Sequence, residues 1–146
     1  MKKFILTSCI ILLGLSYSAY AKQTDYILCS VESSGTDGFI SQATSGGIYI
    51  VFAIDEKYMT QIGFSANKDA AINQASKNKD DDFYKFKIKI NNEDYIYSYF
   101  DLDKSRGWGL YNIFEKKNNK LIQFEFNHSM NMTKIYTSNC EEINLN

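Results

Sequence analysis

Short hydrophobic runs rich in Ile, Val, Tyr and Phe recur along the chain, with turn-forming residues between them. Runs of this length, several of which alternate apolar with polar positions, are typical of β-strands with one solvated face. Eight strands are predicted, at 26–31, 48–54, 58–64, 83–90, 95–102, 109–116, 121–127 and 134–140. So many short strands predict an all-β fold, which is a single antiparallel eight-stranded barrel or sandwich.

One segment, 65–79, has a different pattern. Asn67 is a residue type that caps helix N-termini, and Ala70, Ala71, Ile72 and Ala75 follow it at spacings that place them close together on a helix. We therefore predict one short helix, which crosses over between two strands or covers the barrel as a lid.

The hairpin that turns at 91–94 can be read in register. A four-residue loop there pairs Ile90 with Tyr95, Ile88 with Tyr97 and Phe86 with Tyr99 on one face. The lysines at 85, 87 and 89 alternate onto the other face, where a charge needs solvent. Tyr95, Tyr97 and Tyr99 are therefore predicted to point inward, into the core or a barrel lumen.

A second hairpin is predicted to turn at 117–120, where Asn can take the positive φ angles of tight turns. This register pairs Ile113 with Phe124 and Tyr111 with Phe126 on an inward face. The polar residues of the hairpin then share the solvated face, and they are Asn112, Gln123 and Glu125.

The N-terminus has the three zones of a secretory signal peptide. Lys2 and Lys3 precede an apolar run over 4–15, and small residues lead to Ala21. The apolar run is shorter than the roughly 20 residues of a membrane-spanning helix, and no later run approaches that length. We predict a cleaved signal peptide at 1–21, a single β domain at 22–146 and a periplasmic or secreted protein without a membrane span.

Cleavage after Ala21 would remove Cys9 and leave two cysteines, Cys29 and Cys140. In an oxidising compartment such a pair favours a disulfide, here between the first and last strands. In the chain-entropy model the cross-link contributes about 4 to 5 kcal/mol. The alternative is a reactive free thiol, but neither cysteine has a neighbouring cation that would lower its pKa.

Composition excludes some classes of protein. With 23% charged and 15% aromatic residues in 146 positions, the chain is neither disordered nor long enough for several domains. Its formal charge is −1, and it becomes −3 when Lys2 and Lys3 leave with the signal peptide. The absence of a basic surplus makes nucleic acid an unlikely partner.

The sequence offers no recognisable catalytic or cofactor motif. The single His, His128, cannot supply a zinc ligand set, and a lone loop histidine is more often a polar surface residue than a catalytic base. Asp80, Asp81 and Asp82 lack the ligand spacing of a calcium loop, and no glycine motif cradles a phosphate. We predict no catalytic residue, metal or cofactor.

Lys104-Ser105-Arg106-Gly107-Trp108-Gly109 connects two predicted strands and contains the only Arg and the only Trp of the chain. Both residue types are enriched at interface hot spots, and loops on a rigid sheet often carry binding residues. Arg106 and Trp108 are therefore candidate interface residues. In the alternative interpretation Trp108 closes one end of the barrel and Arg106 only solvates the turn.

The positions of Tyr26, Cys29 and Cys140 give a layout that resembles the small exported lysozyme-inhibitor barrels of Gram-negative bacteria. Those proteins carry a Ser-Gly-x-x-Tyr motif whose loop enters the lysozyme cleft, and this chain has Ser45-Gly46-Gly47-Ile48-Tyr49. The motif lies in the first third of this chain and in the second half of theirs, and this domain is longer. The resemblance is one of layout, and no residue role is carried over from it.

Three functions remain. The first is an exported, non-enzymatic binding protein that blocks another protein, as an inhibitor or immunity protein does to a cell-wall hydrolase or toxin; the acidic mature charge would steer it to a basic partner. The second is a carrier that binds an apolar or aromatic small molecule inside the barrel. The third is a glycan hydrolase that uses a pair of carboxylates, with Glu115 and Glu125 as candidates beside Asp101 and Asp103.

Overall fold

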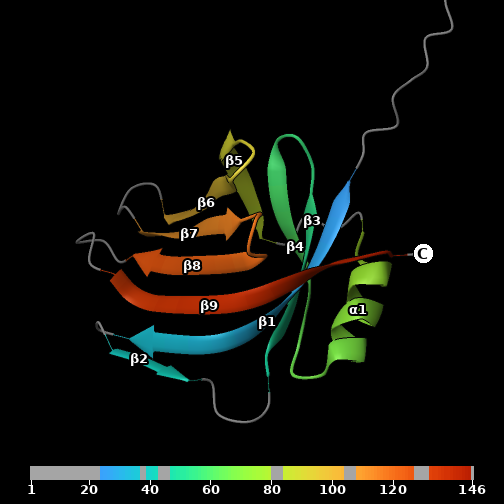
Figure 1. The fold of residues 1–146 in the computed structure, drawn as a ribbon, viewed down its shortest axis with the longest axis horizontal. Helices are drawn as coiled ribbons and strands as arrows, with labels where there is room; N and C mark the ends of the chain where they lie inside the picture. The colour runs from blue at the N-terminus through green and yellow to red at the C-terminus, as the bar shows by residue number, and fades with distance from the viewer. Residues whose placement is uncertain are drawn as a thin grey trace, which may run out of the picture.

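The chain folds into a closed antiparallel β-barrel in the computed structural model, which describes residues 24–36, 39–42, 47–79, 84–103, 108–126 and 132–145 (Figure 1). Each strand of the barrel pairs with its neighbours in the order β1-β3-β4-β5-β6-β7-β8-β9, and β9 pairs back onto β1. A short ninth strand, β2, pairs with the C-terminal part of β1, from Ser33 to Thr36. The strands are β1 Asp25–Thr36, β2 Phe39–Gln42, β3 Tyr49–Ile54, β4 Tyr58–Ser65, β5 Lys85–Asn91, β6 Tyr95–Asp103, β7 Trp108–Glu115, β8 Lys120–Phe126 and β9 Met132–Ile143.

The predicted all-β barrel and its eight strands are thus confirmed, and β2 is an addition that the sequence pattern did not predict. The predicted disulfide is also present: Cys29 and Cys140 are directly opposite one another in the β1–β9 pairing and are bonded. This cross-link joins the two strands whose pairing closes the barrel. The predicted signal peptide at 1–21 lies outside the described residues.

The predicted helix is α1, Lys68–Lys77, and it begins where the sequence indicated. Asn67 is its N-cap, and Asn67 Oδ1 accepts a hydrogen bond of 3.0 Å from the Ala70 N–H. The helix connects β4 to β5 and lies on the outer wall formed by β3 and β4, not over an end of the barrel (Figure 1). It is therefore a crossover that packs on the wall, not a lid.

Close packing of α1 depends on small residues where helix and wall meet. Ala71 and Ala75 are fully buried against the outward side chains of Leu28, Val51 and Ile62. A Cβ on Gly63 would stand 2.4 Å from the Ala71 carbonyl oxygen. Only glycine lets the helix backbone come this near to β4.

The barrel interior is filled by side chains from all around the wall. Its apolar part includes Ile27, Phe52, Met59, Phe86, Phe114 and Leu121. Ser98, Asn112, Gln123 and Ser138, on four successive strands, are buried with them. Gln123 Nε2 donates to Asn112 Oδ1 at 3.0 Å, so this part of the polar interior is internally hydrogen-bonded.

The predicted face of the first hairpin is wrong for the tyrosines. Its loop starts one residue later than predicted, because Asn92 Oδ1 accepts from the N–H groups of Asp94 and Tyr95. A bulge between Ile88 and Ile90 then sets Ile88 opposite Ser98. The inward residues of β6 are Ile96, Ser98 and Phe100, so Tyr95, Tyr97 and Tyr99 lie on the outer face of the barrel.

The second hairpin is inverted as well. Its turn is at 116–119, with Asn119 at φ 51°, and Tyr111 pairs with Phe124 while Ile113 pairs with Ile122. The alternate set faces the interior: Leu110, Asn112 and Phe114 with Leu121 and Gln123. Both sets contain large apolar residues, so alternation could not decide between them. The interior of an eight-stranded barrel is just wide enough to be filled by side chains. Small polar side chains complete the layer in which Met59 and Phe86 lie.

Candidate functional site

The outer wall of β6, β7 and β8 carries a continuous group of five rings and one isoleucine, which we call the aromatic face: Tyr97, Tyr99, Tyr111, Ile113, Phe124 and Phe126. Tyr111 is at its centre. Its ring stacks at 6.4 Å from those of Tyr97 and Tyr99 and meets Phe126 edge-on at 5.2 Å. A shallow groove runs between Tyr97, Tyr111, Ile113, Phe124 and Phe126. All six side chains are only partly buried.

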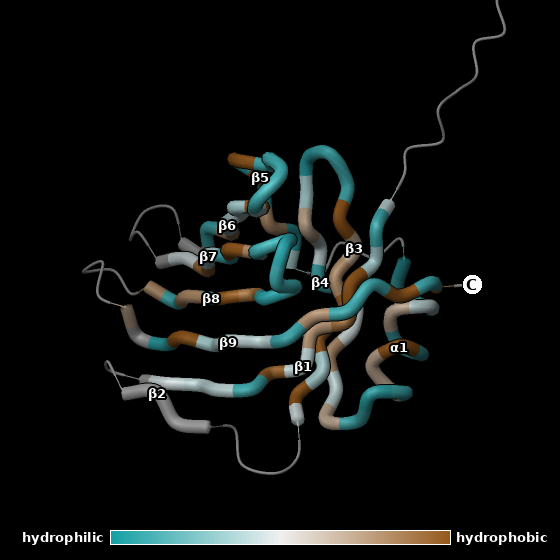
Figure 2. The backbone as a smooth tube through the Cα atoms, in the orientation of Figure 1, coloured by the Kyte–Doolittle hydropathy of each residue, from teal (hydrophilic) through white to brown (hydrophobic). Residues whose placement is uncertain are grey.

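The aromatic face is the counterpart of the wall under α1. Hydrophobic residues gather where β1, β3 and α1 meet, and hydrophobic positions also follow β7 and β8, where no helix lies beside them (Figure 2). Within the described parts of the chain, no second helix covers a barrel wall. The rings of the aromatic face are left to cover one another.

Positive charge borders the aromatic face along β5. Lys85, Lys87 and Lys89 are all exposed, and Lys89 Nζ lies 5.2 Å from the centre of the Tyr99 ring. Burial raises the pKa of the Tyr97 hydroxyl, and the neighbouring Tyr111 and Tyr99 raise it further, so Tyr97 carries no phenolate charge at neutral pH. The result is an apolar surface with a cationic edge.

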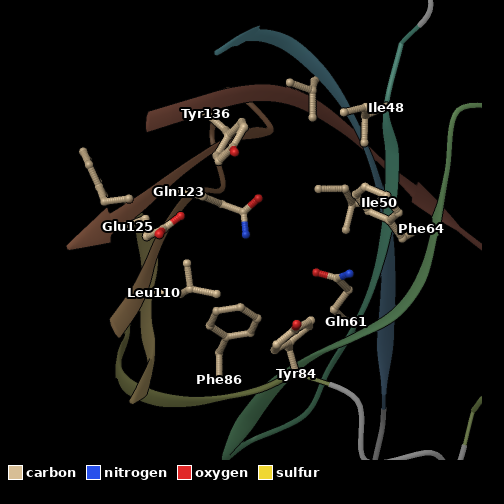
Figure 3. Close-up of a pocket in the computed structure, with 12 residues that line it drawn as sticks. Ile48, Ile50, Gln61, Phe64, Tyr84, Phe86, Leu110, Gln123, Glu125 and Tyr136 are labelled. Atoms are coloured by element: carbon tan, nitrogen blue, oxygen red, sulfur yellow. The ribbon is translucent and has the colours of Figure 1, made fainter. Parts of the chain in front are cut away.

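A second feature is a cavity of about 260 Å³ at one end of the barrel, which we call the barrel-end cavity (Figure 3). Most of its lining is apolar and includes Ile48, Ile50, Phe86 and Leu110. Gln61, Gln123, Glu125 and Tyr136 add polar groups. Glu125 is paired with Lys134 at 3.3 Å, and this hydrogen bond and charge raise the pKa of the Lys134 ammonium.

The predicted interface residues fall partly within the structure. Arg106 lies outside the described residues, and Trp108 is described as the first residue of β7, opposite Asp103. The next residue, Gly109, pairs with Phe126 of the aromatic face. Trp108 therefore starts the strand that carries Tyr111.

The structure does not bring Glu115 and Glu125 together. Glu115 pairs with Lys120 at one end of the β7–β8 hairpin, whereas Glu125 pairs with Leu110 at the other end. Such a separation across the length of the barrel leaves the two without a shared substrate position. Asp101 is exposed on the outer wall.

Among the described residues, no group of three or more His, Cys, Asp and Glu side chains is placed to hold a metal ion. No helix of the same residues is long and apolar enough to cross a membrane. His128 and the 80–82 aspartates lie outside the described residues.

The sequence indicated the aromatic residues but not their side of the barrel, and it allowed for a ligand inside the barrel without identifying the residues that line the cavity. Asn92 precedes Asp94 and Tyr95 at the spacing of a side-chain-capped turn, which is a local signal for the shorter loop. The outward position of the tyrosines follows instead from the bulge between Ile88 and Ile90. The cavity had no local signal, because its lining comes from strands far apart in the sequence.

Comparison with known proteins adds nothing to this picture. No protein-family model matches the chain, and neither a curated protein nor a solved structure does.

Proposed function

We propose that this chain is an exported, non-enzymatic binding protein that blocks another protein, as an inhibitor or immunity protein does to a cell-wall hydrolase or toxin. The aromatic face is the docking surface. The observation that carries the proposal is that a barrel wall bears five aromatic rings in mutual contact, with no described element packed over them. Tyr and Phe rings on a rigid sheet bury much area at little entropic cost, which is typical of binding surfaces.

The charge beside this surface indicates the chemistry of the partner. Lys85, Lys87 and Lys89 form a row along one border, so the partner's contacting edge is expected to carry carboxylates around an apolar patch. The net acidic charge of the mature chain alone would favour a basic partner. The lysine row favours an acidic partner instead, because it borders the surface that docks. The signal-like N-terminus and the disulfide support a periplasmic or secreted location.

The test uses the mature chain and a partner purified by its retention on that chain from the source cell's periplasm. Calorimetry then compares Tyr111→Ala with Phe64→Ala, a control ring that is 51% exposed and lies outside the aromatic face. We expect Tyr111→Ala to weaken binding at least tenfold, since central interface aromatics contribute more than about 1 kcal/mol, and Phe64→Ala to leave it nearly unchanged.

Two further readouts complete the test. The partner's own activity should fall in proportion to the complex formed, and association should slow when Lys87→Glu reverses a charge or when salt is raised. Equal affinities for the two alanine variants would remove the aromatic face from the proposal. A partner that stays fully active in the complex would remove the blocking function.

A further inference from the structure

The barrel-end cavity points to a second binding site, which shares Phe124 with the aromatic face. It lies where β4 and β5 diverge: Tyr58, Met59 and Thr60 pair with β5, but the rest of β4 does not. The N–H of Phe64, on the unpaired part, is instead satisfied by Gln74 Oε1 of α1 at 2.9 Å. The barrel wall therefore opens here, and the Phe64 N–H still has a hydrogen-bond partner.

Two carboxamides project into the cavity from opposite walls, Gln61 from β4 and Gln123 from β8 (Figure 3). Gln123 is 8% exposed and its Nε2 donates to Asn112 Oδ1, so Oε1 is the atom of this amide that can accept a hydrogen bond from a molecule in the cavity. The Gln61 carboxamide lines the same space from the facing wall. Amide oxygens that line an apolar space favour a ligand that brings a hydrogen-bond donor.

The opening of the cavity is bordered by rings that the fold leaves in solvent. Phe64 is 51% exposed and Tyr84 is 43% exposed, and Tyr84 is held edge-on against Phe100 at 5.6 Å. Both line the cavity. Exposed rings at the opening of an apolar cavity can stack against a ring compound that enters it.

We propose that the barrel-end cavity binds a small neutral ring compound, of one or two fused rings, that carries a hydrogen-bond donor. The volume of about 260 Å³ exceeds the roughly 150 Å³ that suffices for benzene and is below the usual range for drug-sized ligands. The ligand is neutral because Glu125, the acidic residue of the lining, is already paired with Lys134. Its donor is accepted by the carboxamide oxygens of Gln61 and Gln123, and its ring lies against Ile50 and Phe86.

Indole is the probe, because it has two fused rings, no charge and one N–H donor. Benzofuran has nearly the same shape and no donor. We expect saturable binding of indole by calorimetry, about tenfold weaker binding of benzofuran, and amide shifts in NMR spectra centred on Ile48, Gln61 and Gln123. Equal affinity for the two compounds would overturn the donor requirement, and shifts centred on Tyr111 and Phe126 would overturn the site.

Two variants test the cavity from within. Ile48→Trp, just before β3, would fill the space and abolish indole binding. Gln61→Met keeps the length of the side chain but removes its amide, and we expect it to lower indole affinity severalfold. Because Gln61 is only partly buried, this variant keeps the test valid if Ile48→Trp fails to fold. Asn73→Met, on an exposed position of α1, is the matched control. Unchanged affinity in Gln61→Met would refute the assigned polar contact.

Discussion

The barrel has two apolar outer walls, and they differ in what covers them. The wall of β1, β3 and β4 presents Leu28, Val51 and Ile62, which are at most 3% exposed because α1 packs over them. The wall of β6, β7 and β8 presents the aromatic face, whose residues stay partly exposed. An apolar outer wall predicts that another element or molecule packs over it. Within the described chain, only the wall of β1, β3 and β4 has such an element, which is α1.

The residue types differ in the same way. The buried side chains of the covered wall are aliphatic and lie beside Gly63, and the helix places Ala71 and Ala75 against them, which allows close backbone approach. The aromatic face instead uses large rings that stack on one another and so stay ordered without a partner. Small residues allow close approach in internal packing, whereas aromatic rings are a residue type enriched at protein interfaces.

The same substitution on the two walls gives the largest contrast. We expect Ile62→Ala, under α1 at 2% exposure, to lower the free energy of unfolding by about 2 to 5 kcal/mol, because it leaves a cavity. Ile113→Ala, on the aromatic face, should cost about 1 kcal/mol or less because solvent already reaches it. Urea unfolding followed by circular dichroism measures both. Similar losses would mean that the aromatic face is as well packed as the covered wall.

The approach of α1 to β4 can be broken at one position. Gly63→Ala places a Cβ 2.4 Å from the Ala71 carbonyl oxygen, so the helix must move, and we expect a loss of about 1 to 3 kcal/mol. Gly47→Ala is the control, because its Cβ meets nothing nearer than 3.5 Å, and it should be close to neutral. Thermal unfolding of both variants gives the comparison. A neutral Gly63→Ala would show that α1 is held only loosely.

The smallest effect concerns pH and the aromatic face. Burial raises the pKa of Tyr97 above its ordinary 10.0, so the folded chain holds this proton more tightly than the unfolded chain does. The resulting stability is complete below pH 10 and is lost as the pH rises through the folded pKa. Tyr97→Phe should therefore reduce the slope with which the free energy of unfolding falls at alkaline pH. The reduction should correspond to less than one proton. Identical alkaline slopes for the two proteins would place Tyr97 in full solvent.

Much of the fold followed from local signals. Alternating runs located all eight barrel strands, and Asn67 marked the start of α1 because an N-cap is a purely local device. The pairing of Cys29 with Cys140 followed from there being two cysteines in the predicted mature chain, one in the first strand and one in the last. Each of these depends on a few neighbouring residues or on simple counting.

The candidate sites were predicted less well, since both depend on which side of a strand faces the interior. The bulge between Ile88 and Ile90 moved Tyr97 and Tyr99 from the expected lumen to the outer wall. In the β7–β8 hairpin, Asn112 and Gln123 were expected in solvent but bond each other inside the barrel. Their burial depended on a partner across the strand, which alternation does not reveal.

Short segments of the chain specify the strands, the helix with its cap, and the two cysteines that can bond. Which side of a strand faces inward depends instead on closure of the barrel, because eight closed strands leave a fixed interior that Phe52, Met59 and Phe86 already largely fill. The rings of β6, β7 and β8 went outside for that reason. The barrel-end cavity formed where the paired part of β4 ended, at a place that no single segment specifies.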